Sequence, residues 1–198
     1  AALTNLGKSN PLCWKNLESS VAIIASIRTS GNSLMKNKLC EVIIKPSQSG
    51  KIRIFSKEAE TSFNADIDNL YSTDHCVTLC SKEHRTLLGD YKYKAMLCEH
   101  FMAACAICKI DSIDVYLSET EFPIFDGSAK VWVDLFKNAG IEGDNKGINN
   151  NLYTVSEPVY YLNGKTSLVI LPSDELFISY AVNYNHKDLT QRWVNYNP

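Results

Sequence analysis

Residues 96–117, MLCEHFMAACAICKIDSIDVYL, predict a helix that is followed by a strand. A helix is expected from Met96 to about Lys109, and up to Cys108 this part is apolar except for Glu99 and His100, which indicates a buried helix. In residues 113–117 apolar and polar side chains alternate, as they do in a strand with one buried face. A helix next to such a strand is typical of a fold in which helices cover a sheet.

Further strands are predicted before this stretch. Residues 21–24, 39–44 and 51–55 are short apolar runs, and the segment 45–50 between the last two has the Pro, Ser and Gly content of a turn. The strands precede the helices in the sequence. The expected fold is therefore an α+β two-layer sandwich, a mixed sheet with two helices on one face, followed by an incomplete second β-rich domain.

The second helix is expected after Asp126-Gly127-Ser128, where Asp or Ser forms a turn and caps free backbone N–H groups. Apolar residues then recur at helical spacing as far as Ala139, and Gly140 is placed to end the helix.

The chain divides into four parts by composition. We expect an N-terminal arm at 1–18, the α+β domain at 19–141, an Asn- and Gly-rich linker at 142–152, and a partial β domain at 153–198. In the last part Asn163-Gly164 separates two strand-like runs, which is a strong hairpin signal. Further strands are expected at about 177–184 and 192–194, and no helix is expected to cover them.

Composition excludes several classes of protein. A formal net charge of −2 and a sequence pI near 6.1 give no general attraction to nucleic acid, and no apolar run is long enough for a transmembrane segment. Seven cysteines without a glycosylation sequon indicate a reducing, intracellular location. We expect a eukaryotic organelle (plastid or mitochondrion) or the bacterial cytoplasm, and the start without Met suits a processed or incomplete chain.

Two motifs carry a family resemblance. Residues 99–104, Glu-His-Phe-Met-Ala-Ala, precede the strand at 113–117, and residues 121–129, Glu-Phe-Pro-Ile-Phe-Asp-Gly-Ser-Ala, follow it. In this order they resemble E-H-L-x-[AS]-A and E-[IV]-P-[IL]-[LM]-D-G-S-A in the first domain of the UDP-3-O-acyl-N-acetylglucosamine deacetylases, the zinc amidases of lipid A synthesis. Residues 179–192 resemble the opening strands of that family's second domain.

The resemblance implies an active site between two domains, where a zinc-bound water removes an N-acetyl group. Glu99 then matches the general base and His100 a zinc ligand. The remaining ligands in the family come from an H-x-x-x-D pair in the second domain. The four histidines of this chain are His75, His84, His100 and His186. None of them is followed four residues later by an Asp or Glu. Residues 25–31 depart from the family's G-x-G-L-H-S-G, because only Ser30 and Gly31 match.

These departures favour a non-catalytic module derived from the deacetylase, a structural or interaction subunit of a larger assembly. Glu99 and His100 are then vestigial and no cofactor is expected. The alternative is an active zinc-dependent deacetylase of lipid A biosynthesis, completed by missing sequence or another chain and binding Zn²⁺. A third hypothesis is carbohydrate or lipid binding without chemistry. Structurally, Glu99 also suits the positive end of a helix, with His100 packed on the sheet.

Other chemical groupings remain open. Cys76, Cys80 and His84, with Cys98, have spacings that allow a structural zinc site. Cys105 and Cys108 form C-x-x-C but are interpreted as small core residues. An aromatic set indicates either sheet packing or an interface, and we expect a protein partner to cover the open strand edges beside it. The set comprises Tyr160, Tyr161, Tyr180, Tyr184, Trp193 and Tyr196.

Overall fold

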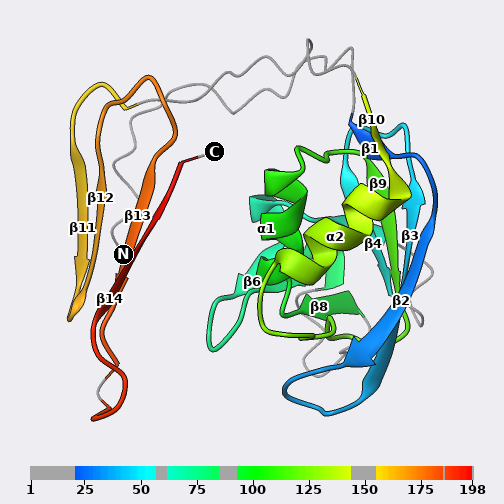
Figure 1. Cartoon of the computed structure of the whole chain (residues 1–198), viewed down its shortest axis with the longest axis horizontal. Helices are drawn as coiled ribbons and strands as arrows, with labels where there is room; N and C mark the ends of the chain where they lie inside the picture. Colours follow the sequence, from blue (N-terminus) through cyan, green and yellow to red (C-terminus); the bar gives the residue numbers. More distant parts are fainter. Residues whose placement is uncertain (1–20, 57–61, 85–92, 144–154, 185, 198) are drawn as a thin grey trace. The chain divides into compact units, whose positions relative to one another are not determined.

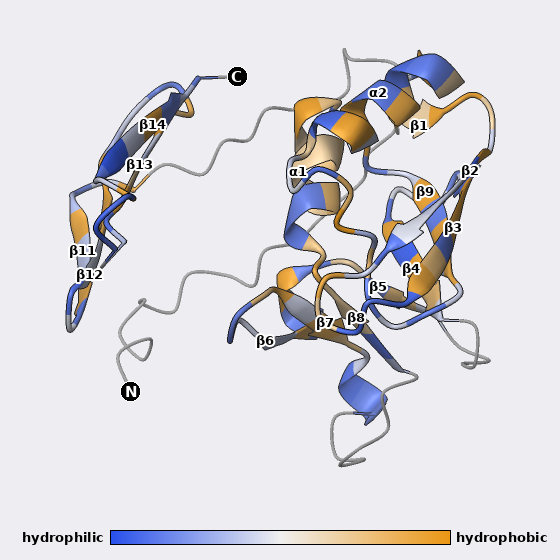
Figure 2. Ribbon diagram, turned by 60° about the horizontal axis from the view of Figure 1, so that its bottom comes forward, coloured by the Kyte–Doolittle hydropathy of each residue, from blue (hydrophilic) through white to orange (hydrophobic). Residues whose placement is uncertain are grey.

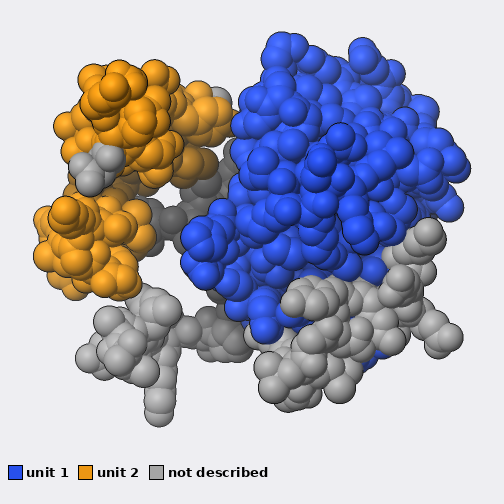
Figure 3. Space-filling view, turned by 90° about the horizontal axis from the view of Figure 1, so that it is seen from below, with its two compact units in different colours: residues 1–148 blue, residues 149–198 orange. Residues whose placement is uncertain are grey.

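The computed structural model describes residues 21–56, 62–84, 93–143, 155–184 and 186–197. The chain divides into two compact units, residues 1–148 and residues 149–198 (Figure 3). The predicted arm at 1–18 lies outside the described residues, as does the part of the predicted linker from residue 144 onward.

A five-stranded mixed sheet forms the first layer of unit 1. Its strands are β2 (Ile27–Asn32), β3 (Leu39–Pro46), β9 (Ile113–Leu117), β4 (Ile52–Ser56) and β5 (Ser62–Asn64), in the spatial order β2-β3-β9-β4-β5. The β9–β4 pair is parallel, and the other neighbours are antiparallel. Hydrophobic and hydrophilic residues alternate along these strands (Figure 2), and because successive side chains point to opposite faces, the inner face is apolar and buried. Its buried members include Cys40, Val42, Ile44, Ile54, Ile113, Val115 and Leu117.

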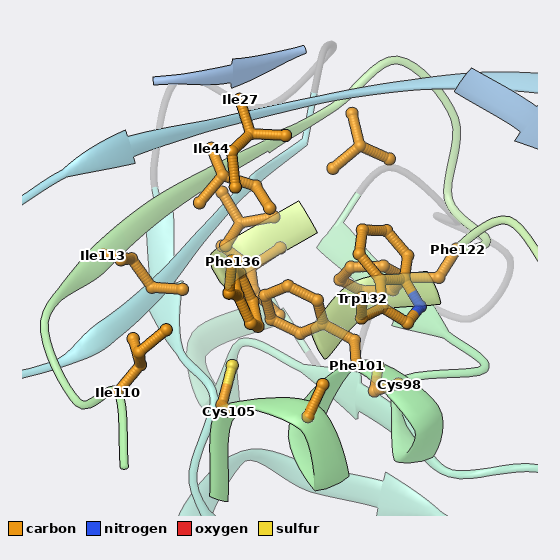
Figure 4. Packing of buried hydrophobic residues seen from close by; sticks show 14 of the residues in the cluster. Ile27, Ile44, Cys98, Phe101, Cys105, Ile110, Ile113, Phe122, Trp132 and Phe136 are labelled. Carbon is orange, nitrogen blue, oxygen red and sulfur yellow. The ribbon is translucent and has the colours of Figure 1, made fainter. Parts of the chain in front are cut away.

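Two helices cover the inner face of this sheet (Figure 1). They are α1 (Glu99–Ile107) and α2 (Lys130–Ala139). Rings from both helices meet over the sheet in one aromatic cluster (Figure 4). Phe101 lies edge-on to Trp132 at 5.2 Å and to Phe136 at 5.8 Å between ring centroids. The predicted two-layer α+β architecture is confirmed.

Both helices are shorter than the sequence predicted. Leu97, with φ +60°, turns the chain just before α1, and Lys109, with φ +56°, turns it just after the helix. The second helix begins at Lys130 and not at Asp126, because Phe125 and Gly127 also have positive φ and form a turn there. Gly140, at φ +76°, ends α2 as predicted.

Smaller elements complete unit 1. The strands β6 (Leu70–Ser72), β7 (Thr78–Cys80) and β8 (Lys94–Met96) form an antiparallel sheet, and β8 leads directly into α1. Two 3₁₀ helices flank it, η1 (Ile67–Asn69) and η2 (Lys82–His84). The predicted first strand is β1 (Ala22–Ile23), which pairs with β10 (Ile141–Glu142).

Unit 2 consists, in its described part, of two hairpins. The strands β11 (Val159–Asn163) and β12 (Thr166–Ile170) pair across Asn163-Gly164, and Gly164 has the positive φ that this turn requires. The strands β13 (Ile178–Val182) and β14 (Arg192–Tyr196) pair in the same antiparallel way. The strands expected from the sequence are confirmed, and no helix occurs among the described residues of this unit.

The hairpins of unit 2 expose apolar side chains. Tyr160 and Val169 lie on one face of β11–β12, while Tyr161 and Leu168 lie on the other, and all four are exposed. A two-stranded hairpin is marginally stable by itself, and a large exposed apolar patch marks an interaction site.

None of the helices in the described part of the chain is long and apolar enough to cross a membrane.

Candidate active site

Glu99 is the first residue of α1, and its carboxylate is anchored by the backbone. Glu99 Oε2 accepts a hydrogen bond from Val77 N–H at 3.1 Å, and the Val77 carbonyl accepts one from Cys98 N–H at 3.3 Å. The residue before β7 therefore holds both the start of α1 and its first side chain. A carboxylate at this end of a helix is also stabilised by the helix dipole.

His100 follows Glu99 in the first turn of α1 and is half-buried, as Glu99 is. Successive residues of a helix leave the axis in different directions, so these two side chains do not face each other. Only one of the two side chains can point straight at the sheet. The position thus gives a fixed carboxylate beside a partly accessible imidazole.

The segment before the second motif lies against β8. Met96 N–H donates to the Thr120 carbonyl at 2.8 Å, and Phe122 N–H donates to the Met96 carbonyl at 3.0 Å. Glu121, between them, is fully buried. The sequence shows Glu121 as part of a motif but gives it no role. A charged residue next to the apolar run Phe-Pro-Ile-Phe was the available signal.

Asp126, Gly127 and Ser128 form a turn. Asp126 Oδ1 accepts hydrogen bonds from Ser128 N–H at 3.0 Å and from the Ser128 hydroxyl at 2.9 Å, and these bonds lower the pKa of the Asp126 carboxyl. Ser128 Oγ in turn accepts from Lys130 N–H at 3.1 Å, at the first residue of α2. Asp126 thus orders the turn, and Ser128 supports the helix start.

The cysteines form no metal site in the described part of the chain. No group of three or more His, Cys, Asp or Glu side chains there could hold an ion, so the zinc site suggested by Cys76, Cys80, His84 and Cys98 is wrong for these residues. Cys98 donates to the Ala95 carbonyl at 2.9 Å, and burial raises the pKa of its thiol. A buried neutral thiol is a packing group, because metal binding requires the thiolate.

The C-x-x-C pair belongs to the core. Cys105 is 1% exposed within the aromatic and aliphatic cluster (Figure 4), and Cys108 packs partly against that cluster. Burial raises the pKa of both thiols. Their interpretation as core residues is confirmed.

The aromatic set predicted as an interface lies in the hairpins of unit 2 and the segments beside them. All six side chains are exposed, from 38% for Tyr196 to 69% for Tyr160. Tyr180 shares one face of β13–β14 with Tyr196, and Trp193 lies on the other face. The set is therefore spread over several faces and does not form one stripe.

The donor set for a catalytic zinc ion is incomplete within the described residues. Such an ion takes about three protein ligands, and His100 offers one imidazole at the start of α1. Since the described residues hold no group of three candidate ligands, they do not by themselves fit the metal.

The sequence matches a known family over most of its length. Residues 21–198 match the sequence model of the UDP-3-O-acyl N-acetylglycosamine deacetylases. The chain is 30% identical over 157 residues to the UDP-3-O-acyl-N-acetylglucosamine deacetylase of Chlamydia muridarum (strain MoPn / Nigg), an overlap of 79% of this chain and 52% of that protein. For the proteins of the same name from Chlamydia caviae and Chlamydia abortus the identities are 31% and 36%, over 80% and 54% of this chain and 53% and 37% of theirs.

This chain spans about half the length of the first of these relatives. Because the family match includes unit 1 and the hairpins of unit 2, it covers every residue that the structure describes. The chain belongs to the UDP-3-O-acyl N-acetylglycosamine deacetylase family.

Proposed function

We propose that this chain supplies the part of a UDP-3-O-acyl-N-acetylglucosamine deacetylase that carries the general base. The contact between Glu99 Oε2 and Val77 N–H carries this proposal. It fixes one carboxylate oxygen to the backbone just before β7, while Oε1 has no hydrogen-bond partner among the described residues. A base needs such a fixed carboxylate with one oxygen open to water.

Amide hydrolysis sets the task of that base. Water adds to the acetyl carbonyl carbon, the bond between that carbon and the sugar nitrogen breaks, and the products are acetate and a free amine. Glu99 takes the proton from the attacking water and returns a proton toward the leaving nitrogen. Removing such a base lowers the rate by roughly 10²- to 10⁴-fold.

His100 is proposed as one ligand of the metal that the family resemblance implies. A zinc ion, when bound, lowers the pKa of its water to about 7. We place the other ligands outside the described residues, in the remainder of the protein or in a second chain. The relatives, about twice as long as their overlap with this chain, support that placement.

A non-catalytic subunit is the second candidate. It is favoured by β2, where residues Ile27–Asn32 form a regular strand in place of the glycine- and histidine-containing family segment. It is also favoured by the exposed apolar faces of the hairpins in unit 2, which suit contact with another protein surface. In this reading a protein partner covers the open edges of β11–β14.

A reducing location inside the cell is proposed for either candidate. None of the six cysteines in the described part of the chain forms a disulfide. Secreted proteins of this size commonly use disulfides, so free buried thiols favour an intracellular compartment. The bacterial relatives favour a bacterial cytoplasm over a eukaryotic organelle.

The test is deacetylation of UDP-3-O-acyl-N-acetylglucosamine by the intact protein, with zinc content measured on the same sample. We expect turnover with stoichiometric zinc, and a loss of roughly 100-fold or more in Glu99→Gln. The control is Glu83→Gln, the same change at an exposed position of η2. Absence of both turnover and zinc from the intact, folded protein would favour the non-catalytic subunit instead.

A second pair of variants tests the anchoring contact. Val77→Pro removes the N–H that binds Glu99, whereas Val77→Ala keeps it. We expect the proline variant to lose about 10- to 100-fold in kcat, because the base is no longer held in place, and the alanine variant to retain its rate. Equal activity in the two variants would contradict a role for this contact.

A further inference from the structure

We propose that Glu121 is the positioning residue that fixes the start of α1, and with it Glu99 and His100; the catalytic part of this inference rests on the proposed function. Glu121 is 0% exposed, and it is the one charged residue classed as buried in the described part of the chain. Burying a carboxylate is costly unless hydrogen bonds compensate it. Its location therefore demands a specific set of donors.

Those donors are two successive backbone amides of the turn between β2 and β3. Met35 N–H donates to Glu121 Oε1 at 2.7 Å, and Lys36 N–H donates to Oε2 at 3.3 Å. Each carboxylate oxygen therefore receives one amide. The side chain of Met35 is exposed, so the turn contacts Glu121 through its backbone.

Neighbouring contacts hold the same turn and segment together. Lys36 Nζ donates to Thr120 Oγ1 at 2.7 Å, and Ile124 N–H donates to the Asn32 carbonyl at 3.1 Å. Ser33 pairs with Pro123 in an isolated bridge. We call these contacts between the β2–β3 turn and residues 120–124 the joint. Glu121 lies at its buried centre, whereas the contact of Lys36 with Thr120 is exposed to water.

The joint continues into the candidate active site through the backbone. Glu121 forms a parallel bridge with Met96, and the hydrogen bonds of Thr120 and Phe122 to Met96 flank that bridge. Met96 is the last residue of β8, three positions before Glu99. The carboxylate of Glu121 thus connects the β2–β3 turn to β8, the strand that precedes Glu99 and His100 in the chain.

In Glu121→Gln the side chain keeps one oxygen that accepts from an amide, and its NH2 group faces the other amide, which loses its acceptor. The contact between the turn and the segment 120–122 is then weakened at its buried centre, and with it the support that this segment gives to Met96. A displacement of about 1 Å at a base costs up to roughly 100-fold in rate. We expect a loss of about 10- to 100-fold in kcat, with KM changed less than about twofold, because the side chain does not touch substrate.

The experiment compares Glu121→Gln with Glu119→Gln in the intact protein. Glu119 is two residues away and half-exposed, and its carboxylate lies 4.0 Å from Lys38 Nζ, so the control repeats the chemical change outside the joint. Met35→Ala is a second control, since it keeps the backbone N–H. The readouts are kcat, KM and the NMR resonances of the Glu99 amide and the His100 ring.

We expect Glu121→Gln to shift the Glu99 and His100 resonances and to lower kcat, while both controls resemble the wild type. Unchanged resonances in Glu121→Gln would overturn the inference. If the wild type has no deacetylase activity, the proposed function fails. The resonances still decide whether Glu121 positions α1, so the two failures can be told apart.

Hydrogen exchange in the wild type keeps the inference testable if Glu121→Gln does not fold. The Met35 and Lys36 amides lie in an exposed turn, yet a buried carboxylate accepts from both. We expect them to exchange slowly, like the amide of Met96. Exchange as fast as that of the exposed Asn37 amide in the same turn would contradict the proposed joint.

Discussion

Phe101 and Phe122 stack with their ring centroids 4.9 Å apart, so the two motifs that carry the family resemblance meet in the core. Trp132 of α2 contacts both rings by its edge, at 5.2 Å and 6.0 Å (Figure 4). The first turn of α1, which holds Glu99 and His100, is therefore braced by aromatic packing from the second motif and from α2.

We expect Phe101→Ala and Phe122→Ala each to lower the free energy of unfolding by about 3–5 kcal/mol, because each leaves a cavity in a fully buried cluster. The double variant is expected to lose less than the sum, with a coupling of about 0.5–1.5 kcal/mol. Denaturant unfolding measures these values. The control is Ile67→Ala on η1, where the side chain is 76% exposed. Additive effects of the two phenylalanines would contradict the stacking contact.

Gly31 of β2 is expected to tolerate no side chain. A Cβ at this position would lie 2.9 Å from the Phe125 ring and 3.0 Å from Pro123 Cβ. We predict that Gly31→Ala costs about 1–3 kcal/mol, measured by thermal unfolding, because a buried proline cannot move aside. Phe125→Leu should restore part of that loss. Stability equal to that of Ser30→Ala, an exposed neighbour, would argue against this close approach.

The buried thiols are expected to react slowly with iodoacetamide in the native protein at pH 8. Burial raises the pKa of Cys98 and of Cys105, so the reactive thiolate is scarcer than in the unfolded chain. Peptide mapping by mass spectrometry should find both unmodified under native conditions and both modified in guanidinium chloride. Rapid native labelling of Cys105 would show that the core opens readily or that this residue is not in it.

Asp126 gives a pH-dependent prediction. Hydrogen bonds from Ser128 lower the pKa of Asp126, so the carboxylate is favoured in the folded protein. The stability from this turn is present above the ordinary carboxyl pKa, about 3.9, and declines as pH falls through the lower folded pKa. We expect Ser128→Ala to raise the midpoint of the Asp126 carboxyl titration by NMR. The same midpoint in both proteins would exclude the Ser128 hydroxyl as a cause.

The hairpins of unit 2 give the last prediction. Trp193 is 66% exposed on β14, whereas Trp132 is 1% exposed in the core. If another surface covers the hairpins, as proposed, Trp193 fluorescence is less quenched by iodide in the native protein than in the same protein unfolded in guanidinium chloride. The difference between wild type and Trp193→Phe isolates this signal. Equal quenching in both preparations would contradict a covered hairpin.

Local patterns predicted much of the fold. Alternation predicted β9, and Asn163-Gly164 predicted the β11–β12 hairpin, because each depends on neighbouring residues alone. β2 was missed as a strand because Arg-Thr-Ser-Gly-Asn carries no apolar alternation after Ile27. Its strand state comes from pairing with β3, which local sequence does not encode.

The candidate site was also predictable only where it depends on neighbouring residues in the sequence. The motif identified Glu99 and His100, but the anchor at Val77 and the donors to Glu121 come from distant segments. The C-x3-C-x3-H spacing suggested zinc although burial keeps the thiol of Cys98 neutral, and burial is a tertiary property. Spacing alone therefore overstated metal binding.

The parallel pairing of β4 with β9 has a consequence for synthesis on the ribosome. β3 and β4 are consecutive in the chain, yet β9 inserts between them in the sheet. A nascent chain that ends before Ile113 lacks β9 and therefore carries two separate hairpins, β2–β3 and β4–β5, whose facing edges have no partner. Such unpaired edges invite association with other chains. The sheet closes only when its central strand arrives last, so premature termination yields an aggregation-prone product.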